Sequence, residues 1–189
     1  MSDTRSERTE RIADAALAVL GRAGARRLTH RAVDAEAGLP EGSTSYYCRR
    51  RVDLLALAER RLLELDRADV ARLAERLSAG RPSLDAIAEG AAGLIVRWLT
   101  PPTRARTMAR YELYLEAARE PAMRATMAEH LLVFGELAGR VGATAAARPG
   151  RAMPILLLAE GITVTALRTG TTPRRRDVAR MLRQGMGGR

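Results

Sequence analysis

The stretch that decides the fold runs from Leu28 to Leu54 and reads LTHRAVDAEAGLPEGSTSYYCRRRVDL. Thr29 is predicted to cap a short helix, because its hydroxyl can accept a hydrogen bond from an unpaired backbone N–H and a short apolar stripe follows it. Gly38 is predicted to end that helix, since glycine adopts the left-handed conformation after a helix at little cost. Pro40 then stands near the start of a second short helix, where its missing N–H is not needed.

Two short helices joined by a glycine-containing turn are typical of a helix-turn-helix, in which the second helix lies in the major groove of DNA. This second helix is expected over residues 41–48, and its outer side carries small or hydrogen-bonding groups. A helix with an apolar stripe, expected over residues 8–21, precedes the pair. Three consecutive arginines, Arg49 to Arg51, follow it where phosphates would pass. We therefore predict a three-helix DNA-binding domain in residues 1–54.

Several short motifs in the first third of the chain support this prediction: Ala13-x-x-x-Leu17, Leu28-Thr29, Ala35-Glu36-Ala37-Gly38-Leu39, Gly42-Ser43-Thr44-Ser45-x-Tyr47 and Arg51-x-x-Leu54. Together they resemble the N-terminal domain of the TetR family of bacterial transcriptional regulators. The resemblance implies that Arg51 contacts a phosphate and that Tyr47 lies against the DNA backbone. One position departs from the family, which has Phe where this chain has Cys48. We interpret Cys48 as a packing substitution.

The composition favours an all-helical protein. Of the 189 residues 47% are apolar but only 3% are aromatic, so the core is built from Leu, Ala, Val, Ile and Met. Such side chains suit packed helices better than strands, which favour β-branched and aromatic residues. No stretch shows the alternating pattern of a strand. The predicted fold class is therefore all-α, with the helix-turn-helix domain joined by a long helix to a C-terminal helical bundle that dimerises.

Other classes of protein are disfavoured. No apolar run approaches the ~20 residues that span a bilayer, and the charged N-terminus lacks a signal segment, so a cytoplasmic location is expected. The single cysteine excludes an internal disulfide, and His30 and His130 form no cluster with metal-ligand spacing, so no metal and no cofactor are expected. The chain lacks an HExxH motif, a glycine-rich phosphate loop and a nucleophile elbow. We therefore do not expect an enzyme.

The net charge of +10 is weak evidence for nucleic-acid binding, because its distribution is uneven. Up to Leu54 the chain has ten arginines and eight acidic residues, whereas much of the excess positive charge lies after Thr172. Local clusters are more informative. The arginines on either side of the proposed recognition helix are Arg22, Arg26, Arg27 and Arg31 before it, and Arg49, Arg50 and Arg51 after it.

A second domain is predicted over residues 55–189. It begins within a long helix expected over residues 52–77, which at about 1.5 Å per residue spans roughly 40 Å. Ser83 is predicted to cap the next helix, and Thr172 a short final one. The remaining helices are expected at 83–99, 103–119, 121–146 and 152–169. The helix 152–169 is apolar on nearly every side and must be covered on every side, so a homodimer is predicted.

Three sets of candidate site residues follow. Groups near the recognition helix are expected to contact DNA: Thr29, Arg31, Gly42, Ser43, Thr44, Tyr46, Tyr47, Arg49 and Arg51. Most of the scarce aromatic residues, interleaved with methionines, are expected to line an apolar effector pocket: Ile95, Trp98, Met108, Tyr111, Tyr114, Met127, His130, Leu131 and Phe134. Small and apolar residues of the last two long helices are expected at the dimer interface: Leu132, Gly135, Gly139, Gly142, Leu156, Ala159, Gly161 and Thr163. Glu112 and Glu116 are expected to face solvent.

The family resemblance implies a homodimeric repressor that binds a near-palindromic operator in double-stranded DNA and is released by a small apolar effector. Two alternatives remain open from the residues alone. A helical adaptor that has lost DNA binding would account for Cys48 and for the weak charge of the N-terminal domain. An all-helical enzyme lacks any recognisable set of catalytic residues. Affinity for any duplex at low salt would distinguish the repressor from the adaptor.

Overall fold

The structure is a computed structural model that describes residues 2–77, 82–124, 128–129, 132, 135 and 152–187. Over these residues it contains helices and no strand, which confirms the predicted all-α class. The elements are α1 (Ser2–Ala23), the 3-10 turn η1 (Ala25–Arg27), α2 (His30–Ala37), α3 (Ser43–Tyr47), α4 (Arg51–Leu77), α5 (Leu84–Trp98), α6 (Arg104–Arg119), the 3-10 turn η2 (Pro121–Met123), α8 (Ala152–Thr169) and α9 (Arg175–Met186).

Local sequence signals set most helix ends where they were predicted. The Thr29 hydroxyl accepts a hydrogen bond from the Ala32 amide at 3.1 Å and caps α2. Gly38 ends α2 with φ 60°, a left-handed conformation that glycine adopts without strain. Ser83 likewise caps α5. The prediction for Thr172 was wrong, because α9 begins at Arg175 and its cap position is Arg174, which makes no capping hydrogen bond through its side chain.

The chain divides into two compact units, one comprising Met1–Leu65 and Arg104–Glu129, the other Asp66–Thr103 and His130–Arg189. Packing therefore groups α6 and the first half of α4 with the helix-turn-helix. The predicted division at residue 54 is a functional one and stays a prediction.

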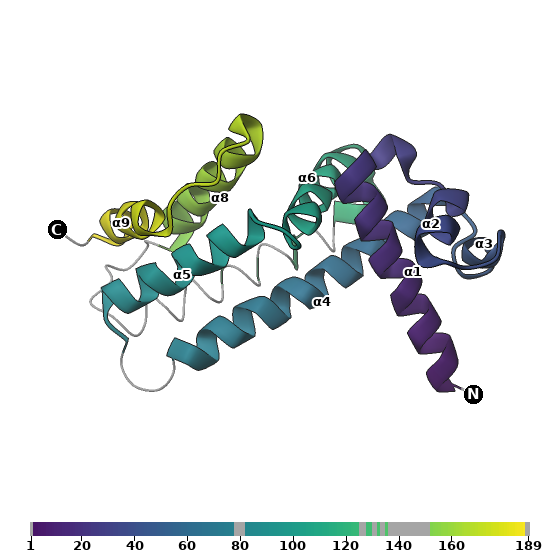
Figure 1. The fold of residues 1–189 in the computed structure, drawn as a ribbon, viewed down its shortest axis with the longest axis horizontal. Helices are drawn as coiled ribbons and strands as arrows, with labels where there is room; N and C mark the ends of the chain where they lie inside the picture. Colours follow the sequence, from purple (N-terminus) through teal and green to yellow (C-terminus); the bar gives the residue numbers. More distant parts are fainter. Residues whose placement is uncertain are drawn as a thin grey trace. The chain divides into compact units, whose positions relative to one another are not determined.

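The first unit is held together by α1, which packs against both α2 and α6 (Figure 1). α1 and α6 approach closely, because a Cβ added at Gly21 would clash with the backbone carbonyl of Ala105. The apolar cluster of this unit draws side chains from α1, α2, α4 and α6, and includes Ile12, Leu20, Leu28, Val33, Leu54, Leu62 and Leu113. The helix-turn-helix therefore shares one core with α6.

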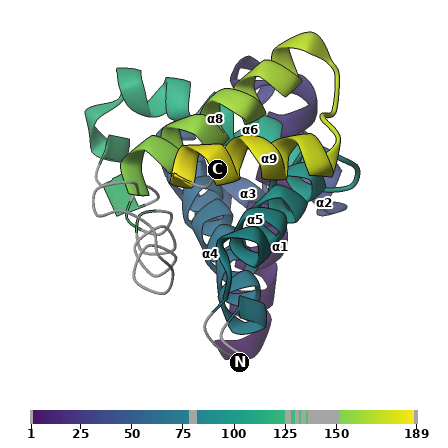
Figure 2. The ribbon, with the colours of Figure 1, turned by 90° about the vertical axis from the view of Figure 1, so that its left-hand side faces the viewer.

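In the second unit α9 packs against α5 and α8 (Figure 2). One face of α9 carries its buried residues at helical spacing, namely Val178, Ala179, Leu182 and Met186. They join a cluster that includes Ile87, Ala92, Ile95 and Leu99 of α5 and its C-cap.

Two further sequence predictions concern the helix expected over residues 121–146 and the lack of a membrane span. Of the helix expected over 121–146, the structure describes η2 and a few helical positions after it, Arg124, Ala128, Glu129, Leu132 and Gly135, and the remainder lies outside the described residues. Within the described part of the chain, no helix has both the length and the apolar composition needed to cross a bilayer.

Candidate DNA-binding and effector sites

A buried carboxylate builds the turn between α2 and α3. Asp34 of α2 accepts hydrogen bonds from the Gly42 amide at 2.8 Å, the Thr44 amide at 2.7 Å and the Thr44 hydroxyl at 2.5 Å. Burial alone raises the pKa of the Asp34 carboxyl, but these hydrogen bonds together lower it below its usual value. Asp34 therefore stays ionised and fixes where α3 begins. The sequence analysis did not single out this residue.

Thr44 does not present its side chain to solvent. It is fully buried, and its hydroxyl is used by Asp34. Its expected contact with DNA bases is corrected to a structural role in the turn. Ser45 and Tyr46 are the exposed residues of α3, and Tyr46 is 75% accessible and packs edge to face against the ring of Tyr47 at 5.3 Å between centroids. Tyr47 itself is half-buried against the core of the unit.

The arginines that follow α3 differ in how they are held. Arg49 is exposed, and among the described residues it has no hydrogen-bond or ion-pair partner. Arg50 pairs with Asp53 at 2.7 Å, one turn along the chain. Arg51 donates to the carboxylate of Glu116 at 2.8 Å and to the carbonyl of Ala25 at 2.8 Å. A phosphate contact by Arg51 would therefore compete with Glu116.

Two glutamates of α6 contact residues that flank the helix-turn-helix, in η1 before it and at the start of α4 after it. Besides the ion pair of Glu116 with Arg51, the carboxylate of Glu112 accepts a hydrogen bond from the Ala25 amide at 2.9 Å. Neither glutamate is solvent-exposed, so the expectation that both face solvent was wrong. These contacts join residues 65 and 87 positions apart, and no local sequence pattern indicates them.

The remaining predicted DNA contacts lie on the same unit. Thr29 and Arg31 are exposed at the start of α2, with Arg31 3.9 Å from Glu41. Gly42 has φ 93° and nothing within 4 Å of the place its Cβ would take, so the backbone there is open. Ser43 is half-buried.

Cys48 supports α3 from inside. It is buried in the apolar cluster, and its carbonyl lies 2.6 Å from the His30 ring nitrogen Nε2. Burial, followed by the charge of Asp53, raises the pKa of the Cys48 thiol, so the reactive thiolate is disfavoured. Cys48 is therefore a packing residue of the core, and its interpretation as a substitution for Phe stays a prediction.

The predicted effector-pocket residues fall in different parts of the structure. Ile95 belongs to the apolar cluster of the second unit, and Trp98 packs there with Leu73 and Leu94. The others described are half-buried in the first unit, namely Met108, Tyr111 and Tyr114, with the two tyrosine rings edge to face. Met127, His130, Leu131 and Phe134 lie outside the described residues, so the pocket stays a prediction.

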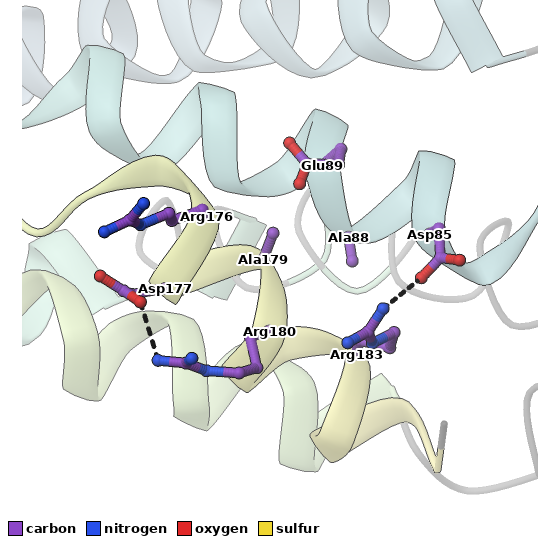
Figure 3. A pocket seen from close by; sticks show the side chains of 8 residues that line it. All are labelled: Asp85, Ala88, Glu89, Arg176, Asp177, Ala179, Arg180 and Arg183. Atoms are coloured by element: carbon purple, nitrogen blue, oxygen red, sulfur yellow. Dashed lines mark hydrogen bonds and ion pairs between the residues drawn. The ribbon is translucent and has the colours of Figure 1, made fainter. Parts of the chain in front are cut away.

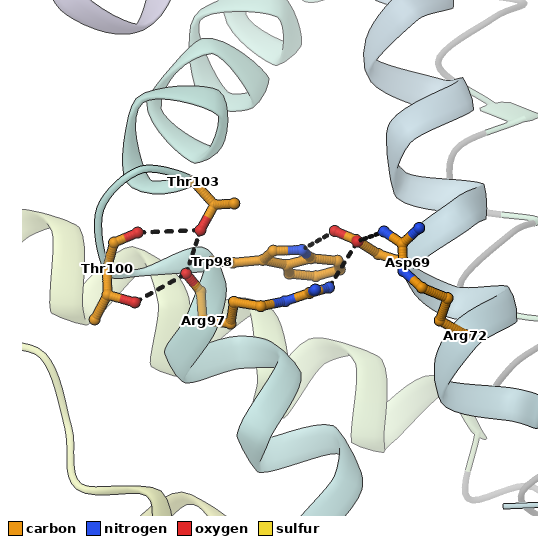
Figure 4. A network of polar contacts seen from close by, with 6 residues as sticks. All are labelled: Asp69, Arg72, Arg97, Trp98, Thr100 and Thr103. Atoms are coloured by element: carbon orange, nitrogen blue, oxygen red, sulfur yellow. Dashed lines mark hydrogen bonds and ion pairs between the residues drawn. The ribbon is translucent and has the colours of Figure 1, made fainter. Parts of the chain in front are cut away.

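Trp98 takes part in a buried polar network of the second unit (Figure 4). Its indole N–H donates to the carboxylate of Asp69 at 2.7 Å, and Asp69 also pairs with Arg72 at 2.5 Å and with Arg97 at 2.6 Å. Asp69 is only 2% exposed, so its charge is balanced inside the protein. The polar edge of Trp98 is therefore occupied by a partner in the chain.

The second unit also has a polar hollow on its surface. It lies between α5 and α9, has a volume of ≈ 500 Å³, and is lined mainly by charged side chains, with Arg183 bonded to Asp85 at 2.9 Å and Arg180 to Asp177 at 2.7 Å (Figure 3). It contains no aromatic residue. Its chemistry differs from that of the predicted effector pocket.

Glu59 of α4 is a third feature that sequence reasoning missed. Its side chain is fully buried in the first unit, and neither carboxyl oxygen has a hydrogen-bond partner among the described residues. Burial and the nearby charge of Glu129 raise the pKa of the Glu59 carboxyl to about 7.

The predicted dimer residues are only partly at the surface. Leu132 and Gly161 are exposed, and Gly135 and Leu156 are partly so. Ala159 instead packs against the core of its own unit, and Thr163 is buried and donates to the Ala159 carbonyl at 2.8 Å. These two positions are therefore used within the subunit. Gly139 and Gly142 lie outside the described residues.

Three large apolar side chains form an exposed stripe on α8. Met153 is 57% exposed, Leu157 65% and Val164 43%, and helical spacing places them on one side of α8 together with Gly161. Because α8 is apolar on nearly every side, periodicity alone does not mark this stripe.

Comparison with known proteins agrees with this architecture. The family model described as "Tetracyclin repressor-like, C-terminal domain" matches residues 82–188. A solved TetR-family member from Streptomyces coelicolor A3 is 32% identical, with 95% of this chain and 98% of that one covered and a TM-score of 0.74. The multidrug binding protein EbrR in complex with ethidium is 32% identical over 95% of this chain and 98% of its own, with a TM-score of 0.73.

The fold and the comparisons together define a helical transcriptional regulator with an N-terminal helix-turn-helix. The chain belongs to the TetR family of transcriptional regulators. The search among curated proteins gave no match. The family assignment covers the C-terminal half as well as the N-terminal third from which the sequence motifs came.

Proposed function

We propose that this protein is a homodimeric repressor that binds a near-palindromic operator and releases it when a small organic effector binds. The observation that carries the proposal is the set of hydrogen bonds that Asp34 accepts from Gly42 and Thr44, which fixes α3 against α2. Tyr46 and Arg49, three positions apart, are both exposed at the end of α3. An exposed aromatic ring and an arginine at the end of a recognition helix suit base and phosphate contacts respectively.

The exposed side of α8 supports the dimer. Leaving Met153, Leu157 and Val164 in water is unfavourable by roughly 25 cal/mol for each Å² of apolar surface. A second copy of the same helix, related by a two-fold axis, would cover this stripe with an identical one. A two-fold dimer presents two recognition helices, and this requires an operator with two inverted half-sites.

The relatives support a small-molecule effector. EbrR has been solved with ethidium, proflavin and malachite green, three flat or propeller-shaped aromatic cations. We expect the effector of this chain to be an aromatic molecule of similar size, contacted by aromatic side chains of the protein. Aromatic side chains supply large apolar contact areas with a polar edge, which suits such ligands.

The adaptor alternative has lost one of its supports. It rested on Cys48 as a sign of a damaged recognition helix, yet Cys48 is buried and α3 is held by Asp34 and His30. Its other support is the weak charge of the N-terminal domain. The effect of that charge on DNA affinity is settled by measuring the affinity directly.

The test is selection of an operator from random duplex DNA, followed by affinity measurements over a range of salt. Because Arg49 has no partner in the described part of the chain, we expect Arg49→Ala to lower the log–log salt slope by about 0.9, the value for one lost phosphate contact. Arg50→Ala is the matched control, since Arg50 already pairs with Asp53 and should change the slope less. Failure to bind any duplex at low salt would favour the adaptor.

A further inference from the structure

Glu59 of α4 is a buried carboxyl to which neither the core nor the proposed DNA contacts assign a role. Its side chain has no exposed surface, and both carboxyl oxygens lie without a hydrogen-bond partner in the part of the chain that the structure describes. Helical spacing places Leu55, Leu62 and Leu63, all buried, on the same side of α4. A carboxyl in such surroundings is costly, because burial removes its water and no group among the described residues replaces it.

Other buried acids of the protein are satisfied, which sets Glu59 apart. Asp34 accepts three hydrogen bonds, and Asp69 pairs with Arg72, Arg97 and the indole of Trp98. The charged group that acts on Glu59 among the described residues is Glu129, which has the same sign. Among the described residues the Glu59 carboxyl thus has no cation beside it, whereas the carboxylates of Asp34 and Asp69 are stabilised by donors of the chain itself.

We propose that Glu59 binds the positive charge of the effector, so that this regulator responds to organic cations. This inference rests on the proposed effector function and specifies its ligand class. A cation beside the carboxyl supplies a charge partner that the described residues do not, and it gains from the low dielectric of the surroundings. An uncharged molecule of the same shape gains nothing from Glu59.

The position of Glu59 also suits a regulatory role. It lies on α4 in the unit that contains the helix-turn-helix, eight residues after Arg51, which is about 12 Å along the helix axis. Cation binding at Glu59 therefore changes a charge inside the unit whose geometry positions α3.

The experiment compares two probes of nearly equal shape by calorimetric titration of the full chain at pH 8. N-methylacridinium carries a permanent positive charge, and acridine is uncharged at this pH. We expect the wild-type protein to bind the cation on the order of tenfold more tightly than acridine. Glu59→Gln should remove this preference and leave acridine affinity within about threefold. Glu64→Gln, an exposed acid of the same helix, is the control that should change neither affinity.

A second readout needs no variant. At pH 6 the Glu59 carboxyl is protonated in the free protein, so pairing with a cation should release up to about one proton per molecule bound. Titrations in buffers of different ionisation enthalpy measure this release, which should be absent with acridine and at pH 9.

The outcomes separate this inference from the proposed function. Equal affinity of the wild-type protein for both probes, without proton release at pH 6, would overturn the role of Glu59 and leave an effector site in place. Retention of the cation preference in Glu59→Gln would overturn it as well. If neither probe bound the wild-type protein, both the inference and the proposed class of effector would be wrong.

Discussion

Asp34 shows how a single side chain determines the geometry of a recognition helix. α3 has only five residues, Ser43 to Tyr47, too few to be stable by their own backbone hydrogen bonds. Asp34 compensates by accepting two amide hydrogens and one hydroxyl hydrogen from Gly42 and Thr44. The Asp34 carboxylate thus supplies hydrogen bonds that a longer helix would form within its own backbone.

Removal of this carboxylate should weaken both folding and DNA binding. Asp34→Ala leaves the Gly42 and Thr44 amides without their acceptor, and we expect a loss of about 2–4 kcal/mol in the free energy of unfolding, measured by urea denaturation. Glu36→Ala is the matched control on the same helix, because it removes only a surface ion pair with Arg22 and should cost less than about 1 kcal/mol. Similar losses in the two variants would contradict the role given to Asp34.

Glu59 should make stability fall as pH rises through neutrality. Its pKa is raised from 4.5 to about 7 in the folded protein, so between these values the folded state binds more protons than the unfolded state. Stability is therefore lost with rising pH over this interval, by at most about 3 kcal/mol, and changes no further above it.

Glu59→Gln removes that titration and should stabilise the protein at pH 8. We expect the melting temperature of this variant to exceed that of the wild-type protein by about 5–10 °C at pH 8, with the difference vanishing near pH 4. Thermal unfolding followed by circular dichroism at both pH values measures the effect. If the melting temperature of the wild-type protein did not fall relative to that of Glu59→Gln between pH 5 and pH 8, the Glu59 carboxyl would be solvated or paired.

At the scale of elements, local chemistry explains which predictions were correct. Thr29, Gly38 and Ser83 mark helix ends through contacts within three or four residues, so the sequence alone reveals them. The buried side of α4 and the core of α1 follow from helical periodicity in the same way. Helix existence and most boundaries were therefore predictable.

The missed features depend on residues distant in sequence. Thr44 is buried because its hydroxyl donates to Asp34, ten positions earlier. Glu112 and Glu116 are drawn out of solvent by their contacts with Ala25 and Arg51. Periodicity shows that a residue lies near a helix face but not which distant group it meets. For α8, whose residues are apolar nearly all round, periodicity could not distinguish the inner side from the exposed stripe.

That exposed stripe provides a test of α8 as the dimer element. Leu157→Arg places a charge in the centre of the stripe, where it would be buried and unpaired in a two-fold dimer. We expect this variant to sediment as a monomer at micromolar concentration, where the wild-type protein sediments as a dimer. Ala86→Arg, on an exposed position of α5, is the control and should remain dimeric. A dimeric Leu157→Arg protein would place the interface elsewhere.

At the scale of the whole molecule, dimerisation and operator binding should be one coupled property. Each protomer carries one recognition helix, so a dimer gains affinity only when both half-sites lie on the same side of the duplex at the correct distance. Insertion of five base pairs between the half-sites of the selected operator rotates one of them by about half a helical turn. Affinity should then fall to that for a single half-site, with half the salt slope of the intact operator, because one protomer's phosphate contacts are lost. The same value should be reached by Leu157→Arg on the unaltered operator, although α8 contains none of the DNA-contacting residues proposed above. Fluorescence anisotropy of both combinations measures this equivalence, and an affinity that is insensitive to the insertion would show that the two half-sites are bound independently.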